Sequence, residues 1–200
     1  YVYTGAGNSY RKGSDYVYCF HGGNGTLAWK FDASSPVCTS PAIEYGRVYF
    51  GGGDRKVYCL DALGSNGQPV KYWEYLTSSI IASSPAVAYG RVYIGDEGRN
   101  AYFYCLDAFG SGGSTSRYWR VSLTPAGRFG VCSSPVATES SIYVGTTGNA
   151  FYCLNRTDGT TRWTETYDGS DYGISSSPAV FQGMVSYVSD NGPLYVIEEK

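Results

Sequence analysis

Four of the six cysteines recur in nearly the same local sequence, Tyr-Cys-Leu or Tyr-Cys-Phe, at Cys19, Cys59, Cys105 and Cys153. Thiolates can bind metals, exchange disulfides or act as nucleophiles. Metal or redox chemistry would require at least two thiols to converge. Equivalent residues of successive structural repeats are instead held a repeat apart, beyond the roughly 7 Å between Cα atoms that a disulfide spans. Since a free cysteine behaves as a small buried hydrophobic residue, the pattern favours packing.

The other two cysteines, Cys38 and Cys132, lie three residues before Pro41 and Pro135. Ala82 and Ser175 occupy the matching place elsewhere, so this position also selects a small residue. Six cysteines in a secreted chain would ordinarily suggest three bridges. The periodic placement argues against bridges here, and the redox compartment stays open.

Other residues capable of chemistry are sparse. The single histidine, His21, falls in a predicted turn, and there is no CxxC or HExxH zinc motif. The acidic pairs Asp96-Glu97 and Asp168 with Asp171 do not match the twelve-residue calcium loop, so solvated turns are the expected role. Sequons at Asn24 and Asn155 fall in turns where Asn and Thr are common, a weak glycosylation signal. The sequence predicts no catalytic, metal-binding or cofactor-binding residue.

Composition indicates strands rather than helices. The 200 residues include 21 tyrosines and 27 glycines, with 16% aromatic and 16% charged residues. A formal net charge of −2 provides no basic surface for nucleic acid. No apolar run approaches the roughly 20 residues of a membrane span. Because the chain begins YVYTG, without Met or an export signal, it is expected to be a mature product or a piece of something longer.

Three sequence markers repeat with a common period. Tryptophans fall at 29, 73, 119 and 163, spaced by 44, 46 and 44 residues. Ser-Pro pairs end at Pro41, Pro85, Pro135 and Pro178, and a β-branched residue followed by Tyr-x-Gly starts at Val2, Val48, Val92 and Ile142. Three series in phase identify an internal repeat in the mid-forties.

Each repeat contains four short stretches with strand character, such as PAIEY, RVYFGG, KVYCLDA and KYWEYL in the second. Four antiparallel strands per unit of this length predict an all-β fold, a β-propeller with four to five blades. A β-sandwich is the alternative. The predicted repeats cover 1–37, 38–81, 82–131, 132–174 and 175–200, in one domain of eighteen strands. The first blade lacks its innermost strand and the last its outermost.

The stretches SSPAVAYGRVYIG (83–95), FYCLDA (103–108) and CLNRTDGTTRW (153–163) resemble the PQQ-like propeller repeat family. That resemblance implies a tryptophan-docking motif, Ala-x-Asp-x-x-x-Gly-x-x-x-Trp, with the cysteines in place of alanine. Cys153, Asn155, Gly159 and Trp163 match it, as do Cys19, His21, Gly25 and Trp29. Cys59, Asp61 and Trp73, and Cys105, Asp107 and Trp119, match with four additional residues before Trp. It also implies a closed ring of seven or eight blades, of which this chain would be part.

The same resemblance implies two kinds of function. Quinoprotein alcohol dehydrogenases close a quinone pocket with two adjacent cysteines, hold calcium and stack the quinone on an axial tryptophan. This chain has no Cys-Cys pair, and all four tryptophans occupy docking positions. We therefore expect the non-catalytic branch, which includes the outer-membrane assembly lipoprotein and surface proteins. The prediction is a binding or scaffolding propeller, extracellular or in the cell envelope, without quinone or metal. A dehydrogenase fragment and a carbohydrate-binding or sensor module are the alternatives.

One propeller face is predicted to bind the partner, because the second-to-third-strand loops and the connections between blades emerge together there. These segments carry residue types enriched at interface hot spots: Tyr10, Arg11, Arg55, Arg99, Arg128, Phe129 and Tyr172. A protein or glycan is the expected partner. The open propeller ends are expected to be covered by further blades or by a second copy.

Overall fold

The computed structural model describes residues 1–8, 11–98, 100–123, 130–166, 173–190 and 192–198. Throughout this described part the regular secondary structure is β-strand, without a helix, so the all-β prediction is confirmed. For the same residues, no helix has the length and hydropathy of a membrane span.

Eighteen strands form five antiparallel sheets within the described residues. The first sheet has β1 (Val2–Asn8), β2 (Arg11–Phe20) and β3 (Leu27–Asp32). The second has β4 (Ala42–Glu44), β5 (Arg47–Gly51), β6 (Lys56–Asp61) and β7 (Lys71–Leu76). The third has β8 (Ala86–Ala88), β9 (Arg91–Gly95), β10 (Tyr102–Asp107) and β11 (Arg117–Ser122). The fourth has β12 (Val136–Ala137), β13 (Ser141–Thr146), β14 (Ala150–Asn155) and β15 (Thr161–Thr166). The fifth has β16 (Ala179–Phe181), β17 (Met184–Val188) and β18 (Leu194–Glu198).

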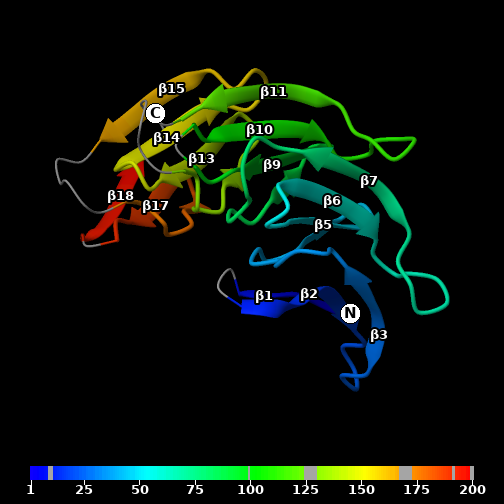
Figure 1. The fold of residues 1–200 in the computed structure, drawn as a ribbon. Coiled ribbons are helices and arrows are strands. Elements are labelled where there is room, and N and C mark those ends of the chain that lie inside the picture. The colour runs from blue at the N-terminus through cyan, green and yellow to red at the C-terminus, as the bar shows by residue number, and fades with distance from the viewer. Residues whose placement is uncertain (9–10, 99, 124–129, 167–172, 191, 199–200) are drawn as a thin grey trace.

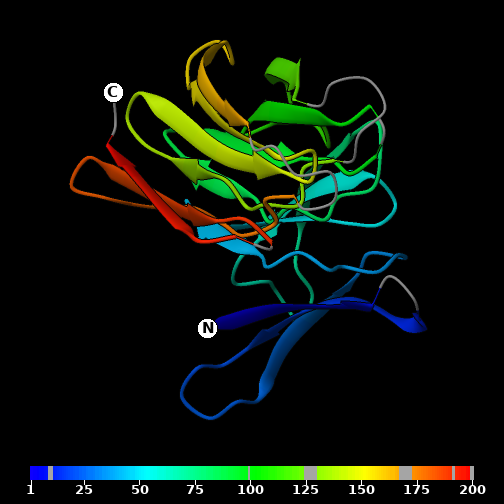
Figure 2. The ribbon, with the colours of Figure 1, turned by 90° about the vertical axis from the view of Figure 1, so that its left-hand side faces the viewer.

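The sheets follow one another around an arc, from the N-terminal sheet in blue to the C-terminal sheet in red (Figure 1). Within each sheet the strands pair in sequence order. The view turned by 90° shows the sheets stacked face against face (Figure 2). This arrangement is that of propeller blades, so the fold-class prediction is confirmed. We call the sheets blades 1 to 5.

The middle strands of blades 2 to 4 are buried on both faces, because each of these blades lies between two others. In β5, Val48 and Phe50 pack in a cluster with Trp29 of blade 1. Tyr49, which points to the opposite face, packs with Trp73 and with Val92 of blade 3. The period-2 alternation of a strand therefore sends successive apolar side chains into two different junctions. This requirement explains the continuous apolar runs VYF, VYI and IYV.

Three junctions between blades use the same hydrogen bond. The Trp29 indole Nε1 donates to the Ala62 carbonyl in the next blade at 2.9 Å. Trp73 Nε1 donates to the Ala108 carbonyl at 3.1 Å, and Trp119 Nε1 donates to the Arg156 carbonyl at 3.2 Å. These three indoles are at most 8% exposed. Since a buried indole N–H needs an acceptor, the carbonyl fixes how the two blades meet.

Each of these carbonyls also accepts a second donor from the preceding blade. The Tyr3 hydroxyl donates to the Ala62 carbonyl at 3.0 Å, and the Tyr49 hydroxyl to the Ala108 carbonyl at 3.1 Å. At the Arg156 carbonyl the second donor is Arg91 Nη1, at 3.0 Å. A carbonyl oxygen has two lone pairs, so it can satisfy both donors at once.

A glycine next to the acceptor turn makes room for the indole. A Cβ on Gly64 would lie 2.6 Å from Trp29 Cδ1, and one on Gly110 would lie 2.3 Å from Trp73 Cδ1. Both glycines have positive φ (69° and 43°), which side-chain-bearing residues rarely adopt. Gly159 serves Trp119 in the same way, whereas a Cβ on Gly25 would meet no atom within 4 Å. The docking glycine therefore belongs to the blade after the tryptophan, and in blades 2 and 3 it lies within the enlarged turn.

The four repeated cysteines are the register partners of the tryptophans: Cys19 with Trp29, Cys59 with Trp73, Cys105 with Trp119 and Cys153 with Trp163. Directly opposed side chains lie on the same face of a sheet. Each cysteine therefore shares a junction with an indole, and each is buried. Cys19, Cys38, Cys59, Cys105 and Cys132 form no disulfide.

Replacing Trp73 by Ala should lower the free energy of unfolding by about 3–5 kcal/mol, because it leaves a large cavity between blades 2 and 3. Trp163 is only partly buried, so Trp163→Ala should cost about 1–2 kcal/mol. Urea unfolding followed by circular dichroism measures both. Equal losses for the two variants would contradict the assigned junction geometry.

Candidate functional site

One face of the arc collects the hairpin loops between second and third strands and the segments that lead from one blade to the next. We call those segments straps and number the described parts 33–41, 77–85, 130–135 and 173–178 as straps 1 to 4. Each strap is hydrogen-bonded to the hairpin loop of the blade it leads into. Gly53 N donates to the Pro36 carbonyl at 2.9 Å, and Glu97 N to the Ile80 carbonyl at 2.7 Å. The same bond recurs in the next two straps, where Thr147 N donates to the Gly130 carbonyl and Asp190 N donates to the Gly173 carbonyl.

Each strap is also anchored to the blade it leaves. Ile81 is buried against β5, where a Cβ on Gly51 would lie 2.3 Å from Ile81 Cγ2. Val131 is buried in the same way against β9, where a Cβ on Gly95 would lie 2.3 Å from Val131 Cβ. This packing explains why the Tyr-x-Gly series ends in glycine. With both blades holding every strap, the loops of this face have defined positions relative to one another.

The serines of the Ser-Pro pairs form a ladder across the inner ends of the blades. Ser40 N donates to Ser84 Oγ at 2.8 Å. Ser84 N donates to Ser134 Oγ at 3.2 Å, and Ser134 N to Ser177 Oγ at 3.3 Å. The Ser-Pro spacing marked the repeat in the sequence, but the serine's role was missed. The sequence did contain a signal for this role. A serine hydroxyl recurs in every repeat directly before a proline, which has no N–H to donate.

Asp96 corrects an expectation from the sequence, since its carboxylate is fully buried rather than solvated. Its Oδ2 accepts from Ser78 N and Ser79 N of strap 2, each at 3.1 Å, and from the Tyr104 hydroxyl at 2.8 Å. Its Oδ1 accepts from Tyr102 N at 2.6 Å. Burial raises the pKa of Tyr104 to about 12, so this hydroxyl keeps its proton near neutral pH. Asp96 therefore fixes strap 2 onto blade 3.

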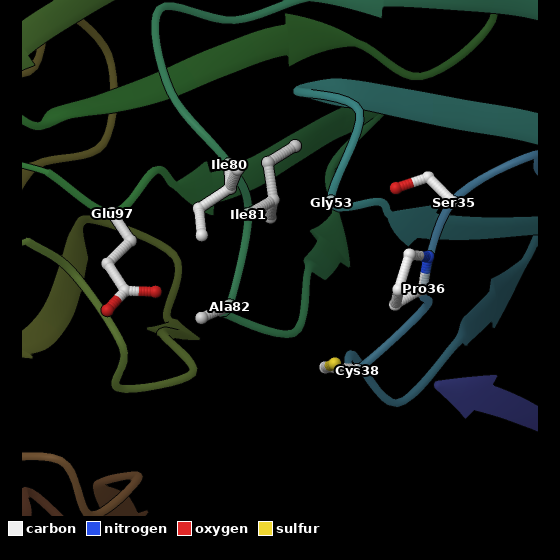
Figure 3. A pocket seen from close by; sticks show the side chains of 8 residues that line it. All are labelled: Ser35, Pro36, Cys38, Gly53, Ile80, Ile81, Ala82 and Glu97. Carbon is white, nitrogen blue, oxygen red and sulfur yellow. The ribbon is translucent and has the colours of Figure 1, made fainter. Parts of the chain in front are cut away.

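A pocket of about 230 Å³ opens on this face between straps 1 and 2 (Figure 3). Its lining residues are mostly apolar or small: Ser35, Pro36, Cys38, Gly53, Ile80, Ile81, Ala82 and Glu97. Glu97 is the only charged residue among them. In Figure 3, Glu97 and Ile80 lie on one side and Ser35 and Pro36 on the other, with Cys38 at the lower edge.

The pocket opens where the strap sequence changes. In straps 3 and 4 the residue before the buried Val or Ile is glycine, and the strap lies directly on the preceding hairpin loop. A Cβ on Gly130 would lie 2.4 Å from Glu97 Cα, and one on Gly173 would lie 2.4 Å from Thr147 Cα. Strap 2 has Ile80 at this place, 42% exposed. A side chain there is incompatible with such close approach, which accounts for the open volume.

Of the predicted binding-face residues, Arg55 is exposed in the hairpin loop between β5 and β6. The backbone of Arg11 lies at the start of β2. Tyr10, Arg99, Arg128, Phe129 and Tyr172 lie outside the described residues, as do Asp168 and Asp171. Their grouping on one face stays a prediction. The sequence drew attention to Cys38, Ala82 and Glu97 for other reasons, but the pocket itself was not predicted, because its lining comes from four segments with no shared motif.

In the described part of the chain, no group of three or more His, Cys, Asp or Glu side chains is placed to hold a metal ion. The side chains that line the pocket offer apolar contact, one carboxylate and one exposed thiol. Such an arrangement can bind a ligand or a protein surface.

Fold and face together define a PQQ-like β-propeller. The family model of the outer membrane protein assembly factor BamB matches residues 2–106 and 99–200. The chain therefore belongs to this family, which confirms the resemblance noted in the sequence. A comparison with curated proteins found no match.

Solved structures show the same fold. BamB from Moraxella catarrhalis superposes with a TM-score of 0.75 at 18% identity, over 98% of this chain and 54% of that one. Quinohemoprotein alcohol dehydrogenase ADHIIG from Pseudomonas putida HK5 superposes with a TM-score of 0.79 at 20% sequence identity, and the match covers 98% of this chain and 38% of that one. The quinohemoprotein alcohol dehydrogenase from Comamonas testosteroni superposes with a TM-score of 0.75 at 19% sequence identity, and the match covers 98% of this chain and 39% of that one. The chain thus spans about half of the BamB structure and about two fifths of each dehydrogenase.

Iodoacetamide at pH 8 should modify Cys38 first, because it is the exposed cysteine. Burial raises the pKa of Cys132 to about 11. Since the thiolate is the reactive form, alkylation of Cys132 should be slow at pH 8 and accelerate as the pH approaches 11. Cys19, Cys59 and Cys105 should react only after unfolding. Mass spectrometry of digests resolves the sites, and native Cys59 reacting as fast as Cys38 would contradict this order.

Proposed function

We propose that this chain is part of a non-catalytic propeller that binds a protein partner through the face carrying the straps. The main observation behind this proposal is the apolar pocket between straps 1 and 2. Each of these straps is held in place by the blade before it and the blade after it. Pre-organised apolar pockets with few polar groups are typical of interface anchor sites. The family, whose model is described as an assembly factor, supports a protein as partner.

A quinoprotein dehydrogenase is the competing function, since such enzymes share the fold. The placement of the tryptophans disfavours it. Trp29, Trp73 and Trp119 lie in outer strands, with their indole N–H groups bonded to the next blade. Trp163 also lies in an outer strand, against Tyr143 and Phe151. An indole in such a junction is not on the propeller axis, where a quinone would stack.

The cell envelope is the proposed location. The name of the family places its reference member in outer membrane assembly, and a binding propeller fits that setting. A carbohydrate-binding module is less well supported, because the pocket lining has few hydroxyl or amide groups to recognise a sugar.

The binding face can be tested with a photo-crosslinking amino acid at Ile80, compared with one at Leu63. Leu63 is exposed in the turn between β6 and β7, at the opposite end of the blade. In the native host, a crosslinked protein partner is expected from position 80 and not from 63. Crosslinks of equal yield from both positions, or none from position 80, would refute the proposed face.

The enzymatic alternative predicts a response to cofactor. Adding pyrroloquinoline quinone and Ca²⁺ to the purified protein should leave its melting temperature unchanged and produce no dye-linked alcohol oxidation. A ligand that binds only the folded state must stabilise it, so a Tm that rises with quinone concentration would overturn the non-catalytic assignment. A quinoprotein dehydrogenase stripped of its cofactor is the positive control.

A further inference from the structure

We propose that the pocket between straps 1 and 2 receives one apolar side chain of the partner, and that a basic group beside that side chain pairs with Glu97. This inference rests on the proposed function and specifies the chemistry of its partner. The recognised element is an aliphatic or aromatic residue next to Lys or Arg.

The size of the pocket sets the size of the occupant. Sites for drug-sized ligands have volumes of roughly 300–1,000 Å³. At about 230 Å³, this pocket falls below that range and suits a single large side chain. Ile80 is exposed, and Pro36 and Ala82 are partly so, which leaves apolar surface available for contact. Burying one aliphatic side chain fully contributes about 1.5–3 kcal/mol, roughly a tenfold or greater effect on binding.

The charge of the occupant follows from Glu97. Its backbone N–H is bonded to the Ile80 carbonyl, which fixes the residue at the pocket edge. Among the residues that the structure describes, its carboxylate forms no hydrogen bond or ion pair, and no Lys or Arg lines the pocket. A carboxylate at the edge of an apolar pocket favours a cation on the occupant and disfavours an anion. Because Glu97 is partly exposed, we expect a preference of about fivefold.

Cys38 supplies a direct test, since its exposed thiol lies at the pocket edge. The test uses a Cys132→Ser variant and four reagents, each a mixed disulfide of cysteamine with one small thiol. The protein is equilibrated with each reagent separately, at increasing concentrations of 2-mercaptoethanol as the competing reductant. Three thiols share an isobutyl group and carry an ammonium, a neutral amide or a carboxylate; the fourth carries only a hydroxyethyl group. The Cys38 thiolate displaces cysteamine, forming a protein–fragment disulfide in a redox-neutral exchange. The 2-mercaptoethanol concentration that halves labelling measures how strongly the pocket holds each fragment.

The 2-mercaptoethanol concentration that halves labelling should be about ten times higher for the isobutyl amide fragment than for the hydroxyethyl fragment. For the isobutyl ammonium fragment it should be about five times higher than for the isobutyl amide fragment. Glu97→Gln should make the ammonium and amide fragments equal while keeping the isobutyl advantage. Ile80→Gly should remove that advantage. Glycine occupies the same place in straps 3 and 4, so this variant is expected to fold, and its melting curve checks this.

Equal retention of isobutyl and hydroxyethyl fragments would overturn the pocket as an apolar subsite. An ammonium preference that survives Glu97→Gln would overturn the role of Glu97. These outcomes are separable from the proposed function. If crosslinking from position 80 succeeds while tethering fails, the face binds a partner but not through this pocket. If tethering follows the expected order while crosslinking fails, the protein-binding function is wrong, and the inference about its partner fails with it.

Discussion

The fold depends on one backbone carbonyl at each of three junctions between blades. The carbonyls of Ala62, Ala108 and Arg156 each accept an indole N–H and a second donor from the preceding blade. Leaving a buried donor unsatisfied costs about 1–3 kcal/mol, so the tryptophan has little freedom to shift. From this bond follow the need for a glycine beneath the indole and for a small residue, cysteine, opposite it. The mid-forties sequence period is the length of chain needed to bring the next such set into place.

Because the junctions are fixed deep between the blades, the straps can vary in sequence. The buried position is always β-branched: Val37, Ile81, Val131 and Ile174. The residue just before it is Pro36, Ile80, Gly130 or Gly173, and this one changes the surface. Glycine lets the strap lie on the preceding loop, whereas Ile80 leaves a pocket. A single position per repeat therefore alters the binding face without disturbing the hydrogen bonds that hold the blades together.

The fold was largely readable from the sequence, because each repeat contains short apolar or aromatic stretches separated by clusters of Gly, Asp, Asn and Ser. The eighteen strands and their grouping into blades follow from that local information. The docking glycine in blades 2 and 3 was missed because Gly64 and Gly110 lie in the four-residue insertions, off the spacing of the motif. The burial of Asp96 depends on Ser78 and Ser79, whose approach only the strap geometry determines. The pocket likewise depends on four separate segments meeting at one place, which no local pattern encodes.

The junction bond has a direction, since the indole always belongs to the earlier blade and the carbonyl to the later one. In the language of symmetry it is a heterologous contact, joining two different surfaces. Two copies related by a two-fold axis would bring donor to donor or acceptor to acceptor, and the bond could not form. Blades joined by this bond therefore associate head to tail, whether within one chain or between chains. Such a series ends by closing into a ring or continues without limit as a helical filament.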